Sequence, residues 1–139
     1  MPENAGKIRD YQDLIVWQKS RGLVKRVYEA TRCFPREEAF GLAQQVQKAA
    51  VSVPSNIAEG YGRGSRKDYI RFLQTARGSL YEVQTQLLLA QDLGYLKPPQ
   101  VASLWQDADD CSRVMQGLLR SLKERGRDAA EKGRGVPPG

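Results

Sequence analysis

The sequence contains no histidine. Histidine is the commonest general base in enzymes and the commonest metal ligand, because its imidazole changes charge near neutral pH. Its absence excludes Ser-His-Asp and Cys-His catalytic systems, and it excludes any zinc site that uses histidine. Since no other nucleophile arrangement is visible, we expect a protein that is not an enzyme and that has no catalytic, cofactor-binding or metal-binding residues.

Cysteine and long apolar segments are also scarce. The two cysteines, Cys33 and Cys111, are too few for a disulfide framework or a metal site, and we expect both to be small core residues. The longest nearly apolar run, residues 87–90, is far shorter than the roughly 20 residues of a membrane-spanning helix. The first ten residues show no signal-peptide pattern. These features predict a cytoplasmic protein with no membrane association.

Three aspartates offer one catalytic alternative. Asp107, Asp109 and Asp110 lie close together in the sequence, and a magnesium-dependent nuclease would need carboxylates of this kind. Only Asp107 and Asp110 share a helix face, however, and no Glu-x-x-His motif accompanies them. We therefore favour a non-enzymatic protein over a nuclease.

The length of 139 residues, with 40% hydrophobic and 27% charged residues, is typical of one globular domain. Residues 1–12 are polar and are predicted to form a flexible arm. Residues 125–139 are rich in glycine, proline and charge and are predicted to form a disordered basic tail. The domain itself is predicted to span residues 13–124.

Four segments of that domain have apolar residues at helical spacing. Nothing alternates with a period of two, so strands are not expected, and the short connections favour antiparallel neighbours. The sequence therefore predicts an all-α, antiparallel four-helix bundle. The expected helices run from about Asp13 to Phe34, from Glu37 or Glu38 to about Ala58 with a kink rather than a break at Pro54, from Ser65 to Gly94, and from about Pro99 to residues 124–126.

The buried face of each helix is also predicted by this spacing. The third and fourth helices each show steps of three and four residues sustained over three heptads. The expected core residues of the first helix are Leu14, Trp17, Val24, Val27, Tyr28 and Thr31, with Val16 and Leu23 widening the stripe, and those of the second are Leu42, Val46, Ala49, Val53 and Ile57. Those of the third are Tyr69, Leu73, Ala76, Leu80, Val83, Leu87 and Ala90. Those of the fourth are Val101, Leu104, Ala108, Cys111, Met115, Leu118 and Leu122, with Trp105 and Leu119 broadening the stripe.

Alternate glycines occur in the stretch EGYGRGS, at Gly60, Gly62 and Gly64. A phosphate-binding loop is rejected, because no apolar strand precedes the glycines and no GK[ST] motif is present. We interpret the stretch as a turn that needs unusual backbone dihedrals, with Ser65 as the N-cap of the next helix.

Basic residues outnumber acidic ones, 22 to 16, for a net charge of +6. They gather around the glycine turn and on the first helix, where they are candidates for binding nucleic-acid phosphates. The alternative is a solvated face with local ion pairs such as Glu59–Arg63. Beside the cluster, Tyr61 and Tyr69 either stack on bases or pack on a helix, and packing is favoured for Tyr69. The candidate nucleic-acid-binding residues are Arg63, Arg66, Lys67, Arg71 and Arg77 near the turn, supported by Lys19, Lys25 and Arg26.

Three motifs in order, SVPSNIAEGYGR, SRKDYIRFL and ARGSLYE, carry a resemblance to a known family. From about Tyr11 to Leu122 the sequence resembles the bacterial four-helix bundle proteins encoded in intervening sequences of 23S ribosomal RNA genes. That family is similar to the accessory variability determinant of diversity-generating retroelements. The resemblance implies a homopentamer and a basic accessory protein that binds structured RNA or RNA–DNA intermediates, RNA in preference to DNA, with a reverse transcriptase as a partner. The alternative is an oligomeric interaction scaffold that docks an acidic partner such as the reverse transcriptase.

Overall fold

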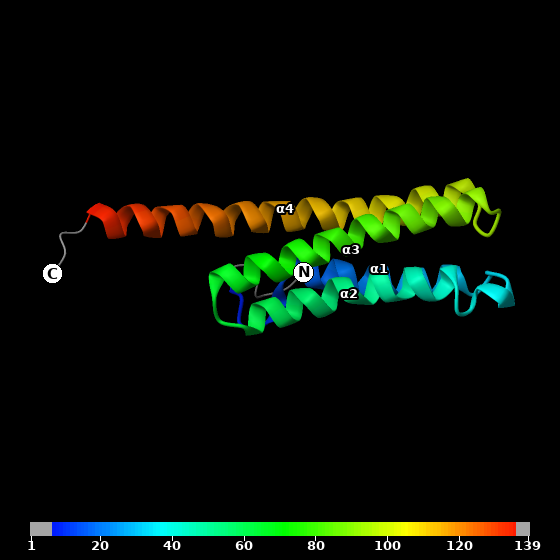
Figure 1. Ribbon diagram of the computed structural model, residues 1–139, viewed down its shortest axis with the longest axis horizontal. Coiled ribbons are helices and arrows are strands. Elements are labelled where there is room, and N and C mark those ends of the chain that lie inside the picture. The colour runs from blue at the N-terminus through cyan, green and yellow to red at the C-terminus, as the bar shows by residue number, and fades with distance from the viewer. Residues whose placement is uncertain (1–6, 136–139) are drawn as a thin grey trace.

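The computed structural model describes the backbone of residues 7–135 and the burial of side chains from Lys7 to Ala130. Within that range the chain forms helices and no strand, which confirms the all-α prediction. The four α-helices run in alternating directions along the long axis of the molecule (Figure 1). In chain order the elements are the short 3-10 segment η1 (Tyr11–Asp13), α1 (Ile15–Thr31), the 3-10 segment η2 (Arg36–Glu38), α2 (Leu42–Gly62), α3 (Arg66–Asp92) and α4 (Pro98–Gly135).

Each helix packs against two others. The packed pairs are α1–α2, α2–α3, α3–α4 and α1–α4, whereas α1 and α3 do not pack together. The four helices therefore form a closed, antiparallel four-helix bundle in which α1 lies diagonally across from α3. A homopentamer of such bundles stays a prediction, since the structure holds one chain.

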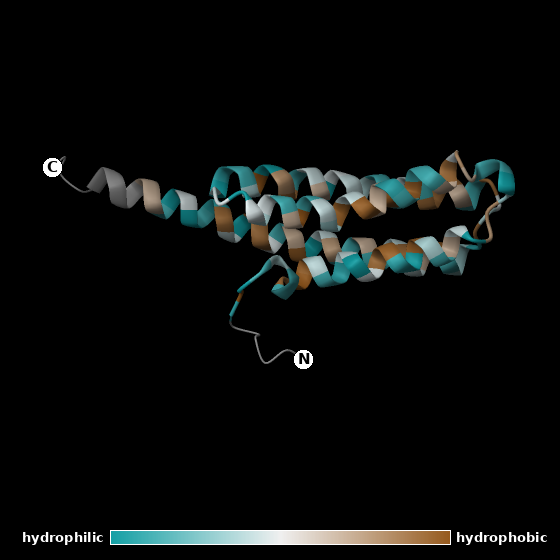
Figure 2. Ribbon diagram, turned by 90° about the horizontal axis from the view of Figure 1, so that it is seen from below, coloured by the Kyte–Doolittle hydropathy of each residue, from teal (hydrophilic) through white to brown (hydrophobic). Residues whose placement is uncertain are grey.

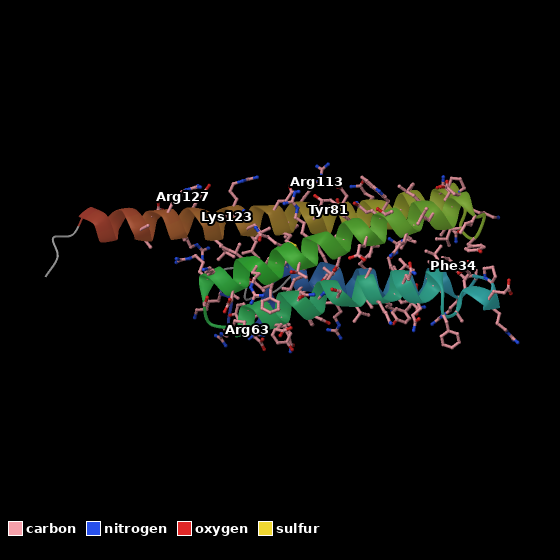
Figure 3. The ribbon with its side chains drawn as sticks, viewed as in Figure 1. Phe34, Arg63, Tyr81, Arg113, Lys123 and Arg127 are labelled. Carbon is pink, nitrogen blue, oxygen red and sulfur yellow. The ribbon has the colours of Figure 1, made fainter. Side chains whose placement is uncertain are left out.

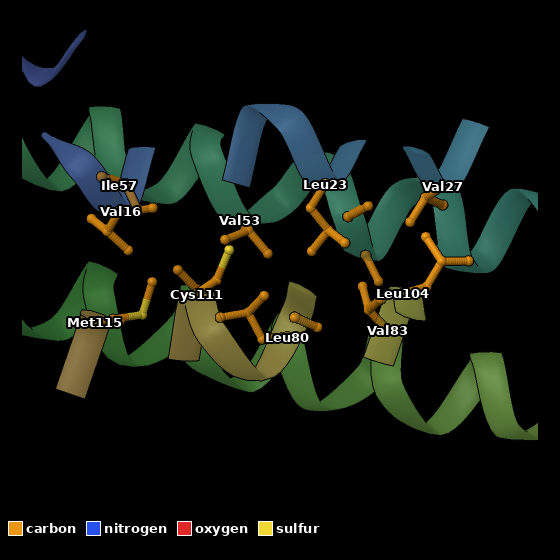
Figure 4. Close-up of a cluster of buried hydrophobic side chains, with 14 of the residues drawn as sticks. Val16, Leu23, Val27, Val53, Ile57, Leu80, Val83, Leu104, Cys111 and Met115 are labelled. Atoms are coloured by element: carbon orange, nitrogen blue, oxygen red, sulfur yellow. The ribbon is translucent and has the colours of Figure 1, made fainter. Parts of the chain in front are cut away.

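The core runs along the centre of the bundle. Every expected seam residue of α3 from Leu73 to Ala90 is buried, while Tyr69 is partly buried. Figure 4 shows Leu80 and Val83 of α3 and Met115 of α4 facing side chains of α1 and α2. Burial of this continuous apolar stripe is the main source of the bundle's stability.

The buried stripe of α1 agrees only in part with the expected one, since Val16, Leu23, Val27 and Thr31 are buried as expected but other residues differ. Trp17 and Val24 are only partly buried, and Tyr28 is 43% exposed. Ser20, a polar residue that the apolar pattern passes over, lies in the core and donates a hydrogen bond to the carbonyl oxygen of Trp17 at 2.9 Å. In α4, Leu119, expected to broaden the stripe, is buried, whereas Leu118 is only partly buried. The stripe of α1 consists of Val16, Ser20, Leu23, Val27 and Thr31.

The two cysteines have different surroundings. Cys111 is buried as expected, and burial raises the pKa of its thiol to about 11. The expectation for Cys33 is wrong, because this residue is exposed and its Sγ donates to the carbonyl oxygen of Ala30 at 3.0 Å.

α2 begins and ends later than expected. It starts at Leu42, whose backbone N–H donates to Oε1 of Glu38 at 2.9 Å, so that the carboxylate caps the helix. This hydrogen bond and a second one from the Tyr95 hydroxyl, at 2.7 Å, hold the pKa of Glu38 below its usual value. The helix continues through Pro54 without a break and reaches Gly62.

The predictions for both chain ends need correction. α4 continues to Gly135, so residues 125–135 are helical and the predicted disordered tail is wrong for them. Alanine, arginine, glutamate and lysine in this segment favour a helix, and they outweigh its glycines. Residues 136–139 lie outside the described range. Figure 1 shows the C-terminal part of α4 extending past the rest of the bundle, and Figure 2 shows the coloured portion of that extension as mostly hydrophilic.

At the N-terminus, the expected flexible arm is partly ordered. Backbone N–H groups of Arg9 and Asp10 donate to the carboxylate of Asp13, and the ring of Tyr11 packs edge-on against Trp17 with centroids 5.2 Å apart. Residues 1–6 lie outside the described range. Across residues 7–135, no helix has the length and apolar character that crossing a membrane requires.

Candidate nucleic-acid interface

The turn between α2 and α3 brings the end of one helix beside the start of the next. Of the three glycines at this turn, Gly64 alone has a positive φ, +79°, which glycine adopts readily. Gly60 and Gly62 belong to α2, so the expected run of three turn glycines is wrong for two of them. Ser65 caps α3 as expected, since its hydroxyl accepts the backbone N–H of Asp68 at 3.1 Å.

Two arginines from the two helices meet over one aromatic ring. The guanidinium of Arg63, at the end of α2, lies 5.0 Å from the centroid of Phe72, and that of Arg71 lies 4.8 Å from it. Arg63 also pairs with Glu59 at 2.9 Å, and Arg71 pairs with Asp68 at 3.4 Å. The Glu59–Arg63 pair is the one that the solvated-face alternative expects. The ring and the carboxylates hold both guanidinium groups near the turn.

Arg66 and Lys67 lie in the first turn of α3. Both are exposed, and neither pairs with a carboxylate among the described residues. Arg66 extends toward α4, where its Cδ lies 3.5 Å from the position that a Cβ on Gly126 would take. The first backbone N–H groups of α3 add to the positive potential here. We call Arg63, Arg66, Lys67 and Arg71 the turn cluster.

Tyr69 packs under this cluster, as favoured from the sequence. Its ring meets Tyr61 edge-on, with centroids 5.9 Å apart, and both rings pack against the core. Burial, together with the nearby Tyr61, raises the pKa of Tyr69 to about 12. Tyr69 therefore stays neutral, and its ring supports the turn rather than offering a face to a base.

Arg77 lies away from the turn cluster, further along α3. Its Nε donates to the hydroxyl of Tyr81 at 3.2 Å, and its guanidinium lies 5.6 Å from the centroid of the Tyr81 ring. This hydrogen bond lowers the pKa of the Tyr81 hydroxyl. Arg77 thus belongs to a different surface, the groove between α3 and α4.

That groove contains a hollow of about 330 Å³, which we call the α3–α4 hollow. Four of the six residues lining it are cationic, and none is acidic. Figure 3 shows Lys123 and Arg127 on α4, apart from Arg63 at the turn. Arg120 and Lys123 were not among the expected site residues, and Arg127 was assigned to the disordered tail. The lining residues are Arg77, Gln116, Leu119, Arg120, Lys123 and Arg127.

The basic residues of α1 lie on yet another side. Lys19 and Lys25 are exposed and make no ion pair with a described carboxylate. Arg26 pairs with Asp107 of α4 and donates to the hydroxyl of Ser103 at 3.0 Å. The guanidinium of Arg26 therefore ties α1 to α4, and its part in nucleic-acid binding stays a prediction. Since α1 is diagonal to α3, these residues do not extend the turn cluster.

The aspartates considered for catalysis are engaged in pairs on α4. Asp107 pairs with Arg26, Asp109 pairs with Arg113 at 2.9 Å, and Asp110 accepts from the Gln106 amide at 3.0 Å. Each carboxylate thus has its own partner, and the three do not converge on one point.

Comparison with known proteins supports the four-helix fold and identifies the protein family. The chain is an all-α four-helix bundle with a basic turn and a basic groove. Its residues 12–117 match the 23S rRNA-intervening sequence protein family, and the chain belongs to that family. It is similar in fold to a crystal structure from Bacteroides thetaiotaomicron, a protein of unknown function from the S23 ribosomal protein family. That likeness has a TM-score of 0.68 and 22% identity, and it covers 76% of this chain and 98% of the other. No curated protein matches the sequence.

Proposed function

We propose that this protein is a non-enzymatic accessory protein that binds structured RNA, or an RNA–DNA intermediate, through its phosphates. The observation that carries the proposal is the turn cluster. Two of its cations, Arg66 and Lys67, are exposed and unpaired among the described residues at the first turn of a helix. Free backbone N–H groups and unpaired cations in one place form a site for a phosphate.

Charge and family membership support this proposal. The net charge of +6 attracts polyanions, and phosphate contacts supply most of the affinity in such interfaces. Membership in the 23S rRNA-intervening sequence protein family suggests an RNA-associated role and favours RNA over DNA as the ligand. Because phosphate contacts do not read bases, selectivity would come from the shape of the RNA or from a protein partner.

The turn cluster makes a direct prediction. Replacing Arg66 and Lys67 by alanine together should weaken binding to an RNA hairpin, because two cations that release counterions from phosphates are lost. The slope of log affinity against log salt should become shallower by about 1.4–1.8, which corresponds to about 0.7–0.9 per lost phosphate contact. Fluorescence anisotropy at several salt concentrations measures this slope.

The matched control replaces Arg32 and Arg36 by alanine. These two arginines are also exposed, but they lie at the opposite end of α2, near η2. This variant has the same net charge as the Arg66–Lys67 variant, so a general charge effect would change both slopes equally. Equal slopes in the two variants would remove the turn cluster from the RNA-binding site.

An oligomeric interaction scaffold is the second candidate function. It is favoured by apolar surface at the opposite end of the bundle, where Leu88, Leu89 and Leu93 are about half exposed. Beside them, Trp105 and Val101 line a mostly apolar groove of about 490 Å³ between α3 and α4. Exposed apolar patches of this kind are typical of protein contacts. A scaffold of this kind would assemble as a homopentamer and would dock an acidic partner such as a reverse transcriptase.

A further inference from the structure

We propose that the α3–α4 hollow binds a run of successive phosphate groups. The hollow shares no residue with the turn cluster, so this inference stands or falls separately from the proposed function. It extends phosphate binding to a second surface. This surface is formed by Arg77 of α3 and by residues of α4 close to the segment that extends past the bundle.

The charge of the hollow is the first argument. Four cationic side chains line about 330 Å³ without a carboxylate among them. Arg77, Arg120 and Lys123 make no ion pair with any described carboxylate elsewhere. Like charges held this close repel one another, and the repulsion does not help the bundle to fold. A bound polyanion would remove that cost.

The position of Arg77 is the second argument. This side chain is half-buried, its Nε is bound to the Tyr81 hydroxyl at 3.2 Å, and its guanidinium lies near the Tyr81 ring. Its two terminal nitrogens are not used by any described hydrogen bond. A guanidinium held in this way has less entropy to lose when it binds a phosphate with both nitrogens.

The spacing along α4 is the third argument and indicates the class of ligand. Gln116, Arg120, Lys123 and Arg127 step by four, three and four residues, so they share one helix face. At about 1.5 Å of rise per residue, Arg120 and Arg127 are about 10.5 Å apart along the axis. Cations distributed over this length can contact more than one phosphate of a chain, so the hollow fits a run of phosphates better than a single one. An RNA strand and a free polyphosphate both supply that chemistry.

The test uses inorganic tripolyphosphate as the probe and the full-length protein. Binding is measured by isothermal titration calorimetry, and NMR shifts of the Gln116 side-chain amide locate the site. Replacing Arg120 and Lys123 by glutamine should weaken tripolyphosphate binding at least about tenfold, because several charge-assisted hydrogen bonds are lost. Both side chains are exposed, so the melting temperature should change little.

The matched control replaces Arg113 by glutamine in the same helix. Arg113 pairs with Asp109 and lies outside the hollow, so this variant should bind tripolyphosphate like the wild type. The affinity of the same variants for an RNA hairpin then distinguishes an RNA strand from a free polyphosphate as the ligand. Parallel loss of tripolyphosphate and hairpin affinity supports the site as one for an RNA strand, whereas loss of tripolyphosphate affinity alone supports it as one for a free polyphosphate.

The inference is overturned if tripolyphosphate binds the double variant as tightly as it binds the wild type, or if the Gln116 amide does not shift. That result would leave the turn cluster untouched, because its own test uses Arg66 and Lys67. Conversely, unchanged RNA binding in the Arg66–Lys67 variant would refute the role of the turn cluster and leave the hollow in place.

Discussion

Replacing Leu80 by alanine should lower the free energy of unfolding by roughly 2–5 kcal/mol. Leu80 is fully buried in the middle of the α3 seam, where Figure 4 shows it among side chains of the core. The alanine would remove buried methyl groups and leave a cavity that rigid neighbouring helices fill only in part. Chemical denaturation followed by circular dichroism measures the loss.

Leu89 provides the matched control, because it is a leucine of the same helix that is 46% exposed. Replacing Leu89 by alanine should change the stability by no more than about 0.5 kcal/mol. If both substitutions lower the free energy of unfolding by the same amount, Leu80 does not lie in a close-packed core and the packing described for α3 is wrong.

Replacing Gly60 by alanine should also destabilise the bundle, by about 1–3 kcal/mol. Gly60 is buried where α2 passes close to α3, and a Cβ there would lie only 2.6 Å from the Cβ of Phe72. Because a Cβ cannot rotate away, the two helices would have to separate. That cost exceeds the gain of about 1 kcal/mol that alanine normally brings to a helix. Thermal denaturation measures the difference.

Gly78 is the matched glycine for this comparison. It lies in the interior of α3, it is exposed, and a Cβ there would meet no atom within 4 Å. Replacing Gly78 by alanine should therefore stabilise the protein by roughly 0.5–1 kcal/mol. The account predicts opposite signs for the two substitutions, and a stabilising Gly60 substitution would contradict the close approach of α2 and α3.

The helices and most of the core could be predicted from the sequence, because heptad spacing reports directly which face of a helix is buried. The α3 seam from Leu73 to Ala90 shows this most clearly. In α1 the same reasoning found Val16, Leu23, Val27 and Thr31 but missed Ser20, which occupies a core position and satisfies its hydroxyl within its own helix. A polar core residue of this kind is invisible to an apolar pattern.

The candidate sites were predictable only where their residues are neighbours in sequence. The turn cluster lies within Arg63–Arg71, so local charge was enough to find it. The α3–α4 hollow joins Arg77 to Arg120, Lys123 and Arg127, which lie more than forty positions later, and only helix packing brings them together. The spacing of Arg120, Lys123 and Arg127 was a usable signal, but the expected tail was taken to begin at residue 125.

Arg26 shows what the sequence of one helix does not reveal. It lies on the polar side of α1 as expected, and Asp107 of α4 pairs with it in the folded bundle. Whether a surface arginine is available to a ligand depends on which carboxylates neighbouring helices place beside it. The spacing of residues within α1 carries no information about that.

The central claim is that exposed cations at the α2–α3 turn bind the phosphates of structured RNA. Its most direct test is the affinity of the wild-type protein for an RNA hairpin over a range of salt concentrations, with an acidic protein as the control ligand. The account predicts tight binding that weakens steeply with salt, and much weaker binding to the acidic protein. Weak binding to the hairpin even at low salt would contradict it, and preferential binding of the acidic protein would favour the interaction scaffold.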